Sequence, residues 1–170
     1  MAHRGLPPNS QGGGEEDAGN ERDSRGGDDM YEIIYMSSAT KLLSEEEVNS
    51  LLVQARHFNY INYITGVLLY IEGDFLQVIE GQKETIDALF ERIKKDKRHH
   101  GIIVVYEGEK EKRQFSDWSM GFHSSSYENL RKIVGFEDIS KRQLLNVEDK
   151  IAYLFLDTFI KSHNDKISFW

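Results

Sequence analysis

The chain has 170 residues, with 21 Lys and Arg against 29 Asp and Glu, which gives a formal net charge of −8 and disfavours nucleic-acid binding. It contains no cysteine, so disulfides, thiolate metal sites and cysteine nucleophiles are excluded. No apolar run reaches the ~18–20 residues of a membrane span and no secretory signal pattern begins the chain, so we expect a cytoplasmic protein.

Residues 1–29 differ in composition from the rest of the chain. They hold three Arg, seven Asp and Glu, both prolines, seven of the fourteen glycines and no Phe, Trp or Tyr. All 19 aromatic residues lie in residues 30–170. A segment with so little apolar surface cannot offset the entropy cost of ordering it. We therefore expect a disordered acidic extension, followed by a globular domain.

The globular part shows strand and helix patterns from residue 31 onward. β-branched and aromatic runs predict five strands, at 31–36, 67–71, 75–80, 102–106 and 115–122. Apolar residues at helical spacing predict three helices, at 44–58, 83–95 and about 147–163. Ser44 and Glu47 form a capping box that begins the first helix. The segments 59–65 and 108–113 are predicted to be connectors.

The order β-α-β-β-α-β-β predicts a ferredoxin-like α+β fold, with two helices on one face of a single sheet. In the last strand, alternation places Trp118, Met120 and Phe122 on one face. Residues 124–170 are expected to add short C-terminal helices. The apolar stripe of the clearest one is predicted to comprise Ile151, Leu154, Phe155, Thr158 and Phe159.

Gln77 is a polar residue at the centre of an otherwise apolar strand. A buried amide costs about 1–3 kcal/mol unless it is hydrogen-bonded, so either it has a partner in the core or it lies on a solvated face. Its carboxamide can reverse its hydrogen-bond pattern by rotating. Tyr35 is predicted to be a core residue whose phenol needs a partner. Asn59 fits a turn, while Trp118 and Met120 fit core packing.

Motifs of known enzyme classes are absent from the sequence. There is no Gly-rich phosphate loop. His99 and His100 are adjacent, so they cannot share a helix face, and no metal site is expected there. The acidic run Glu45–Glu47 is placed to interact with a helix dipole rather than to act as a general acid and base.

Five short motifs occur in order along residues 30–123. They are Tyr35-Met36-Ser37, Asn59 with Ile64-Thr65-Gly66, the run Phe75–Gly81, Arg92 with Asp96 and Arg98-His99-His100, and the run Phe115–Met120. Together they resemble the BLUF domains, which are blue-light sensors that use flavin. The fold implied by the resemblance is ferredoxin-like, in agreement with the predicted order of elements.

The resemblance implies that FAD or FMN lies between the two helices on one face of the sheet. It implies that Tyr35 donates an electron and a proton to the excited flavin. It also implies that Gln77 bridges the Tyr35 phenol and the N5/O4 edge of the flavin, and that Asn59 hydrogen-bonds the flavin carbonyl and imide region. The further cofactor-binding residues that it implies are Arg92, Asp96, Arg98 and His99. The relay residues that it implies, which would pass the change to strand five and the C-terminal helices, are Ser37, Trp118 and Met120.

Two positions depart from the family pattern. Phe58 stands where many relatives have a His or Asn that contacts the flavin, and Ala55 replaces a common Ser. A phenylalanine ring can stack on the flavin but cannot hydrogen-bond with it. We therefore expect these positions to affect flavin binding and the rate of recovery.

The sequence thus predicts a flavin photosensor without an enzymatic activity of its own. The 47 residues after position 123 are too few for a catalytic domain, so we expect a homo-oligomer that contacts a separate effector protein, with no nucleic-acid or membrane partner. One alternative is a ferredoxin-like regulatory or ligand-binding domain that does not bind flavin. Another, an acyl-phosphate hydrolase on the same fold, lacks a Gly-rich anion loop.

Overall fold

The computed structural model describes residues 30–116, 119–123 and 150–167. Its elements in chain order are β1 (Met30–Ala39), α1 (Glu45–Ile61), β2 (Thr65–Ile71), β3 (Asp74–Gln82), α2 (Lys83–Lys94), β4 (His99–Lys110), β5 (Gly121–His123) and α4 (Lys150–Ile167). The expected extension at 1–29, Trp118 and residues 124–149 lie outside the described residues. Within the described ranges, no helix is both long and apolar enough to cross a membrane.

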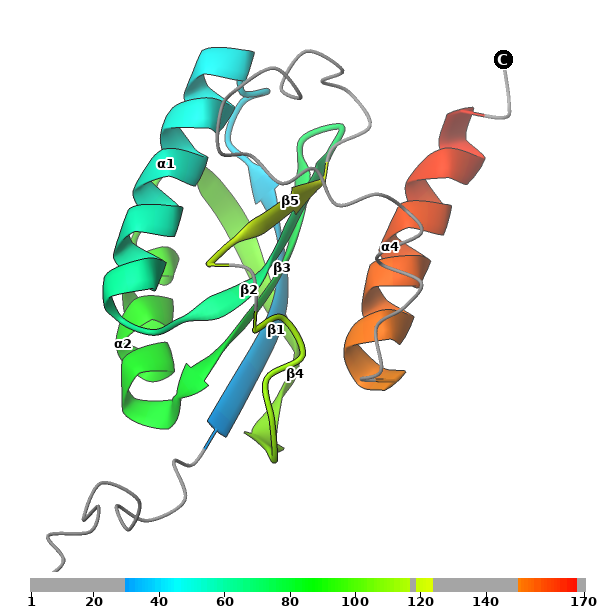
Figure 1. The fold of residues 1–170 in the computed structure, drawn as a ribbon. Helices are drawn as coiled ribbons and strands as arrows, with labels where there is room; N and C mark the ends of the chain where they lie inside the picture. The colour runs from blue at the N-terminus through cyan, green and yellow to red at the C-terminus, as the bar shows by residue number, and fades with distance from the viewer. Residues whose placement is uncertain (1–29, 117–118, 124–149, 168–170) are drawn as a thin grey trace, which may run out of the picture.

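The strands form one five-stranded sheet in the order β4-β1-β3-β2-β5. β1 pairs antiparallel with β3 and β4, β2 pairs antiparallel with β3, and β5 runs parallel to β2. Helices α1 and α2 lie on one face of this sheet, and α4 lies on the opposite face (Figure 1). The predicted ferredoxin-like α+β fold, with two helices on one face, is confirmed.

Two apolar cores lie on the two faces of the sheet. Neighbouring residues of a strand point to opposite faces, so Tyr35 of β1 faces α1 and α2 while Ile34 faces α4. The first core includes helix residues Val48, Leu52, Ile86 and Phe90. The second core includes α4 residues Ala152, Leu156, Phe159 and Ile160. Strands β1, β2 and β3 are therefore buried on both faces, whereas the edge strand β4 is partly exposed.

Helix α1 begins as predicted and ends later than predicted. Ser44 Oγ accepts the Glu47 amide at 3.2 Å, and Glu47 Oε2 accepts the Ser44 amide at 2.9 Å. The helix continues to Ile61 and β2 begins at Thr65, so the predicted connector at 59–65 is wrong at its two ends and comprises only residues 62–64. Asn59 lies in the last helical turn. Asn59 follows Leu52 by seven residues and lies on the same buried face of the helix. Because Asn59 is polar, the apolar spacing stopped at Phe58 and did not indicate the final turn.

Strand β4 extends to Lys110, beyond the predicted end at residue 106, so the predicted connector at 108–113 is wrong in its first part. Lys110 Nζ lies 2.5 Å from Glu32 Oε2 and 3.0 Å from Glu80 Oε2, and both carboxylates are buried. Burial alone would lower the pKa of Lys110, but Glu80 and Glu32 raise it above its usual value. This buried ion cluster holds the end of β4 in the sheet.

The predicted strand at 115–122 is wrong in length, because β5 comprises only Gly121–His123. The backbone amides of Gln114 and Phe115 donate to the Glu80 carboxylate, at 2.9 and 2.6 Å. These amides are therefore bonded to a side chain instead of a neighbouring strand. Met120 and Phe122 belong to the same core, as the alternation predicted.

The apolar stripe predicted for the C-terminal helix is wrong in phase. In α4, Ile151 and Leu154 are 40% and 59% exposed, whereas Ala152 and Leu156 are buried. Apolar residues occur on more than one side of this helix, so spacing alone did not determine which side faces the sheet. Of the predicted stripe, Phe159 is buried against the sheet and Phe155 packs, partly buried, against the same core.

Candidate functional site

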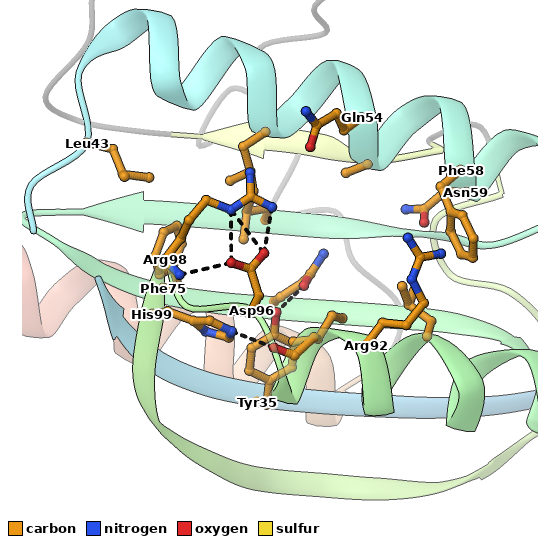
Figure 2. A pocket seen from close by; sticks show the side chains of 16 residues that line it. Tyr35, Leu43, Gln54, Phe58, Asn59, Phe75, Arg92, Asp96, Arg98 and His99 are labelled. Atoms are coloured by element: carbon orange, nitrogen blue, oxygen red, sulfur yellow. Dashed lines mark hydrogen bonds and ion pairs between the residues drawn. The ribbon is translucent and has the colours of Figure 1, made fainter. Parts of the chain in front are cut away.

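A cavity of about 210 Å³ lies between the sheet, α1 and α2 (Figure 2). All seven predicted cofactor-binding residues line it: Tyr35, Asn59, Gln77, Arg92, Asp96, Arg98 and His99. Leucine, isoleucine and phenylalanine side chains supply much of the remaining wall. An apolar cavity with a few converging polar groups is typical of a small-molecule binding site.

Tyr35 and Gln77 form a hydrogen-bonded pair on the sheet side of the cavity. They lie directly opposite each other on the antiparallel strands β1 and β3, which brings their side chains together. The Tyr35 hydroxyl donates to Gln77 Oε1, and both side chains are more than nine-tenths buried. Gln77 is thus a buried residue with a partner, and the solvated alternative is wrong. Burial raises the pKa of the Tyr35 phenol, and the charge of Asp96 raises it further.

The amide nitrogen of Gln77 points to the segment before β5. Gln77 Nε2 lies 3.5 Å from Met120 Sδ, and a thioether is a weak acceptor. The same segment is bonded to α1, because Asn59 Nδ2 donates to the Ser119 carbonyl at 2.7 Å and Arg56 Nε donates to the Met120 carbonyl at 3.0 Å. The Gln77 amide therefore keeps donor capacity for a cavity ligand, while Met120 stays within its reach.

Asp96 and Arg98 bind each other at one end of the cavity (Figure 2). Arg98 Nε lies 3.0 Å from Asp96 Oδ1 and Nη2 lies 2.5 Å from Oδ2, a two-bond contact of planar groups. Hydrogen bonds from Arg98 lower the pKa of the Asp96 carboxyl against the opposing effect of its partial burial. Asp96 therefore remains ionised at neutral pH.

His99 lines the cavity, and both of its ring nitrogens contact protein groups. Nε2 lies 2.7 Å from the Ile93 carbonyl and must donate, because a carbonyl oxygen only accepts. Nδ1 lies 2.8 Å from Ser37 Oγ. The ring is thus held between α2 and the cavity side of β1.

Phe58 and Arg92 lie together at the other end of the cavity, near Asn59 (Figure 2). The Arg92 guanidinium carbon is 4.2 Å from the centre of the Phe58 ring, within the range of a cation–π contact. The Phe58 ring therefore packs against the Arg92 guanidinium in this structure. Ala55 also lines the cavity.

The side chains present fit a flavin. Its planar ring requires apolar walls, its carbonyl and imide edge requires donors and acceptors, and its phosphate side tolerates a cation. Gln77 and Asn59 supply amides at the cavity, and Arg92 supplies guanidinium donors. In the described part of the chain, no group of three or more His, Cys, Asp or Glu could hold a metal ion.

Some residues that build the site were not identified from sequence. Arg56 fixes Met120 through a backbone carbonyl, and an arginine in the middle of a helix gives no signal of that contact. Glu80 fixes residues 114–115 and did carry a signal, because it is an acidic residue in the same apolar strand as Gln77. The proposed role of Trp118 stays a prediction, since this residue lies outside the described ones.

The fold and the cavity define a ferredoxin-like domain with a ligand-binding cavity that contains a buried phenol–amide pair. The sequence model of the BLUF family, described as sensors of blue-light using FAD, matches residues 30–121. The chain belongs to the BLUF family.

Several proteins of known kind are similar to this chain. The photoactivated adenylate cyclase subunit beta of Euglena gracilis is 30% identical over 108 residues, which are 63% of this chain and 12% of that protein. The dark-state structure of the BLUF protein BlrB is 26% identical, with a TM-score of 0.58 over 80% of this chain and 98% of that one. Klebsiella pneumoniae BlrP1, solved with FMN and cyclic diGMP, is 28% identical, with a TM-score of 0.52 over 55% of this chain and 25% of that one.

Proposed function

We propose that residues 30–123 form a flavin-binding light sensor in which Tyr35 and Gln77 are the photoactive pair. The observation that carries this proposal is the buried hydrogen bond from the Tyr35 hydroxyl to Gln77 Oε1 within the cavity. When bound, a flavin supplies the absorption of blue light and a reversible acceptor for one electron. The proton movement and the change of hydrogen bonds that follow are assigned to Tyr35 and Gln77.

The Tyr35 phenol is suited to lose an electron and a proton reversibly. The Tyr35 hydroxyl donates to Gln77 Oε1, so the proton could move along this hydrogen bond when a bound flavin takes the electron. The electron and the proton would both return to Tyr35, which restores the phenol. Gln77 then stores the event by changing its hydrogen-bond pattern. Because both side chains are buried, each intermediate pattern leaves polar groups unpaired, which slows the return.

We propose FAD as the cofactor, with FMN as the alternative. The family is described by its use of FAD, and the similar protein BlrP1 was solved with FMN. Asn59 and Arg92 would hold the ring edge, since they lie at one end of the cavity, and Asp96, Arg98 and His99 would border the other part of the ligand. Protein extracted from its natural source and analysed for its flavin distinguishes the two cofactors.

We propose that the sensor has no catalysis of its own and signals by contact. Met120 touches Gln77, and Ser37 touches His99, so both are placed to respond to the cavity, and Trp118 is proposed to join them as a relay residue. Residues 124–170 are proposed to carry the output to a separate effector, with the chain acting as a homo-oligomer in the cytoplasm. Residues 1–29 are proposed to be dispensable for sensing.

The colour of the purified protein tests the proposed function. The protein is expected to be yellow, and blue light is expected to shift its flavin bands to the red, with return in the dark. Its visible absorption spectrum before, during and after illumination measures this. A colourless protein that cannot be reconstituted with FAD or FMN would instead support the alternative of a regulatory domain without flavin.

The light response is expected to keep its full amplitude as the pH rises from neutral to about pH 10. An exposed tyrosine has a pKa of about 10, and burial followed by the charge of Asp96 raises the pKa of Tyr35 above that value. The phenol therefore retains its proton throughout this range, and the response is lost only at higher pH. Difference spectra recorded across a pH series check this, and a fall in amplitude centred near pH 8 would contradict it.

A further inference from the structure

His163 of α4 contacts Asp74, the first residue of β3 after the β2–β3 turn. His163 is 3% exposed and lies on the face of α4 that meets the sheet. Its Nδ1 donates to the Phe159 carbonyl at 2.7 Å, and its Nε2 lies 3.2 Å from Asp74 Oδ2. In Figure 1, the β2–β3 turn and the C-terminal half of α4 lie at the same end of the sheet.

The Asp74–His163 contact continues through the sheet to the cavity. Asp74 Oδ1 accepts the Ser38 hydroxyl at 2.9 Å, and the preceding residue, Ser37, contacts His99 at 2.8 Å. Successive residues of a strand point to opposite faces, so Ser37 faces the cavity and Ser38 faces α4. Two adjacent serines of β1 thus connect a cavity-lining histidine with a buried histidine of α4.

The docking of α4 does not depend on this polar contact. Leu156, Phe159 and Ile160 bury apolar surface against β2 and β3, and the His163 ring itself stacks near Phe159 with centroids 4.3 Å apart. Asp74 retains 38% exposure of its side chain, so it can be hydrated without His163. The polar contact therefore adds a link to the end of β1 that apolar packing does not supply.

We propose that the Asp74–His163 contact couples the cavity to α4. Asp74 and His163 would act as positioning residues, which transmit a change in the cavity to the position of α4 without touching the ligand. This proposal rests on the proposed light-sensing function. Tyr35 lies two residues before Ser37 on the same strand, so a rearrangement at Tyr35 and Gln77 displaces the end of β1. Ser38 and Asp74 pass that displacement to His163. The displacement would thus reach α4 through the end of β1 and the start of β3. This coupling is separate from the one through Met120 and β5.

Coupling between two sites is reciprocal, so a change at α4 must alter the return of the flavin to its dark state. His163→Phe keeps an aromatic ring for apolar packing and removes both the contact with Asp74 and the hydrogen bond to the Phe159 carbonyl within α4. The size of the light-induced red shift is expected to be unchanged, while the dark-recovery rate changes about fivefold or more. The light-minus-dark difference in amide hydrogen exchange over Lys150–Ile167 is expected to disappear. Asp74→Asn leaves His163 and its bond to Phe159 in place, but removes the carboxylate charge and replaces one acceptor oxygen with an amide donor. It is expected to alter recovery in the same direction.

Asp157→Asn provides the matched control. It removes the ion pair of 2.7 Å between Lys161 and Asp157 in the same helix, without touching the Asp74–His163 contact. Its recovery rate and its exchange difference should equal those of the wild type. The proposal is overturned if His163→Phe recovers at the wild-type rate and keeps the exchange difference. If the wild type itself shows no red shift, the proposed function fails and this coupling fails with it.

Discussion

The Tyr35→Phe variant is expected to bind flavin and to show no light-induced red shift. The substitution removes one hydroxyl and keeps the ring, which packs 5.4 Å from the ring of Phe90, so the cavity wall is preserved. It also removes the hydrogen bond that the Tyr35 hydroxyl donates to Gln77 Oε1, and with it the phenol that can be oxidised reversibly. Absorption difference spectra under blue light, at a measured ratio of flavin to protein, check the result.

Tyr70→Phe is the matched control for this prediction. Tyr70 is also a buried tyrosine, 1% exposed, but its hydroxyl bonds the Leu43 amide at 3.0 Å and the residue does not line the cavity. Removing that hydroxyl is expected to cost about 1–3 kcal/mol of unfolding free energy and to leave the red shift intact. A normal, reversible shift in Tyr35→Phe would disprove the role of Tyr35 as donor.

The first three strands and the start of the first helix could be predicted because local patterns and tertiary packing agree there. The capping box at Ser44 and Glu47 is formed by a four-residue segment, and the structure contains it. Tyr35 and Gln77 were identifiable for the opposite reason, because a phenol and an amide in apolar strands conflict with their surroundings. The register that places them opposite each other is a property of the paired strands and could not be derived from either strand alone.

Other parts of the structure depend on contacts that no local pattern shows. The strand predicted at 115–122 was too long, because the bond between the Phe115 amide and the Glu80 side chain joins residues 35 apart in sequence. The buried face of α4 was misplaced, because apolar residues occur on more than one side of that helix. In both cases, contacts with residues distant in sequence determine the strand length or the buried helix face, which the local sequence does not specify.

The Gln77→Leu variant is expected to lose the light-induced red shift, as Tyr35→Phe does, for a different reason. Leucine fills a similar volume between Tyr35 and Met120 but has no group that can exchange donor and acceptor. Rotating the Gln77 amide by half a turn would bring Oε1 toward Met120 Sδ, and a thioether has no hydrogen to donate. The rotated amide is therefore stable only if Met120 moves away or a cavity ligand supplies a hydrogen-bond donor. In this way the Gln77 amide couples a change in the cavity to the position of Met120.

Gln54→Leu is the matched control, because Gln54 lines the same cavity from α1 and its amide donates to Ser50 Oγ of the same helix, at 3.4 Å, instead of to Met120. Its red shift is expected to equal that of the wild type. In Gln77→Leu, the Tyr35 phenol remains and can still be oxidised by light, so transient spectroscopy should detect electron transfer that is followed by direct return without a long-lived product. A long-lived red-shifted state in Gln77→Leu would place the switch in another residue, and Met120 would then be the first to substitute.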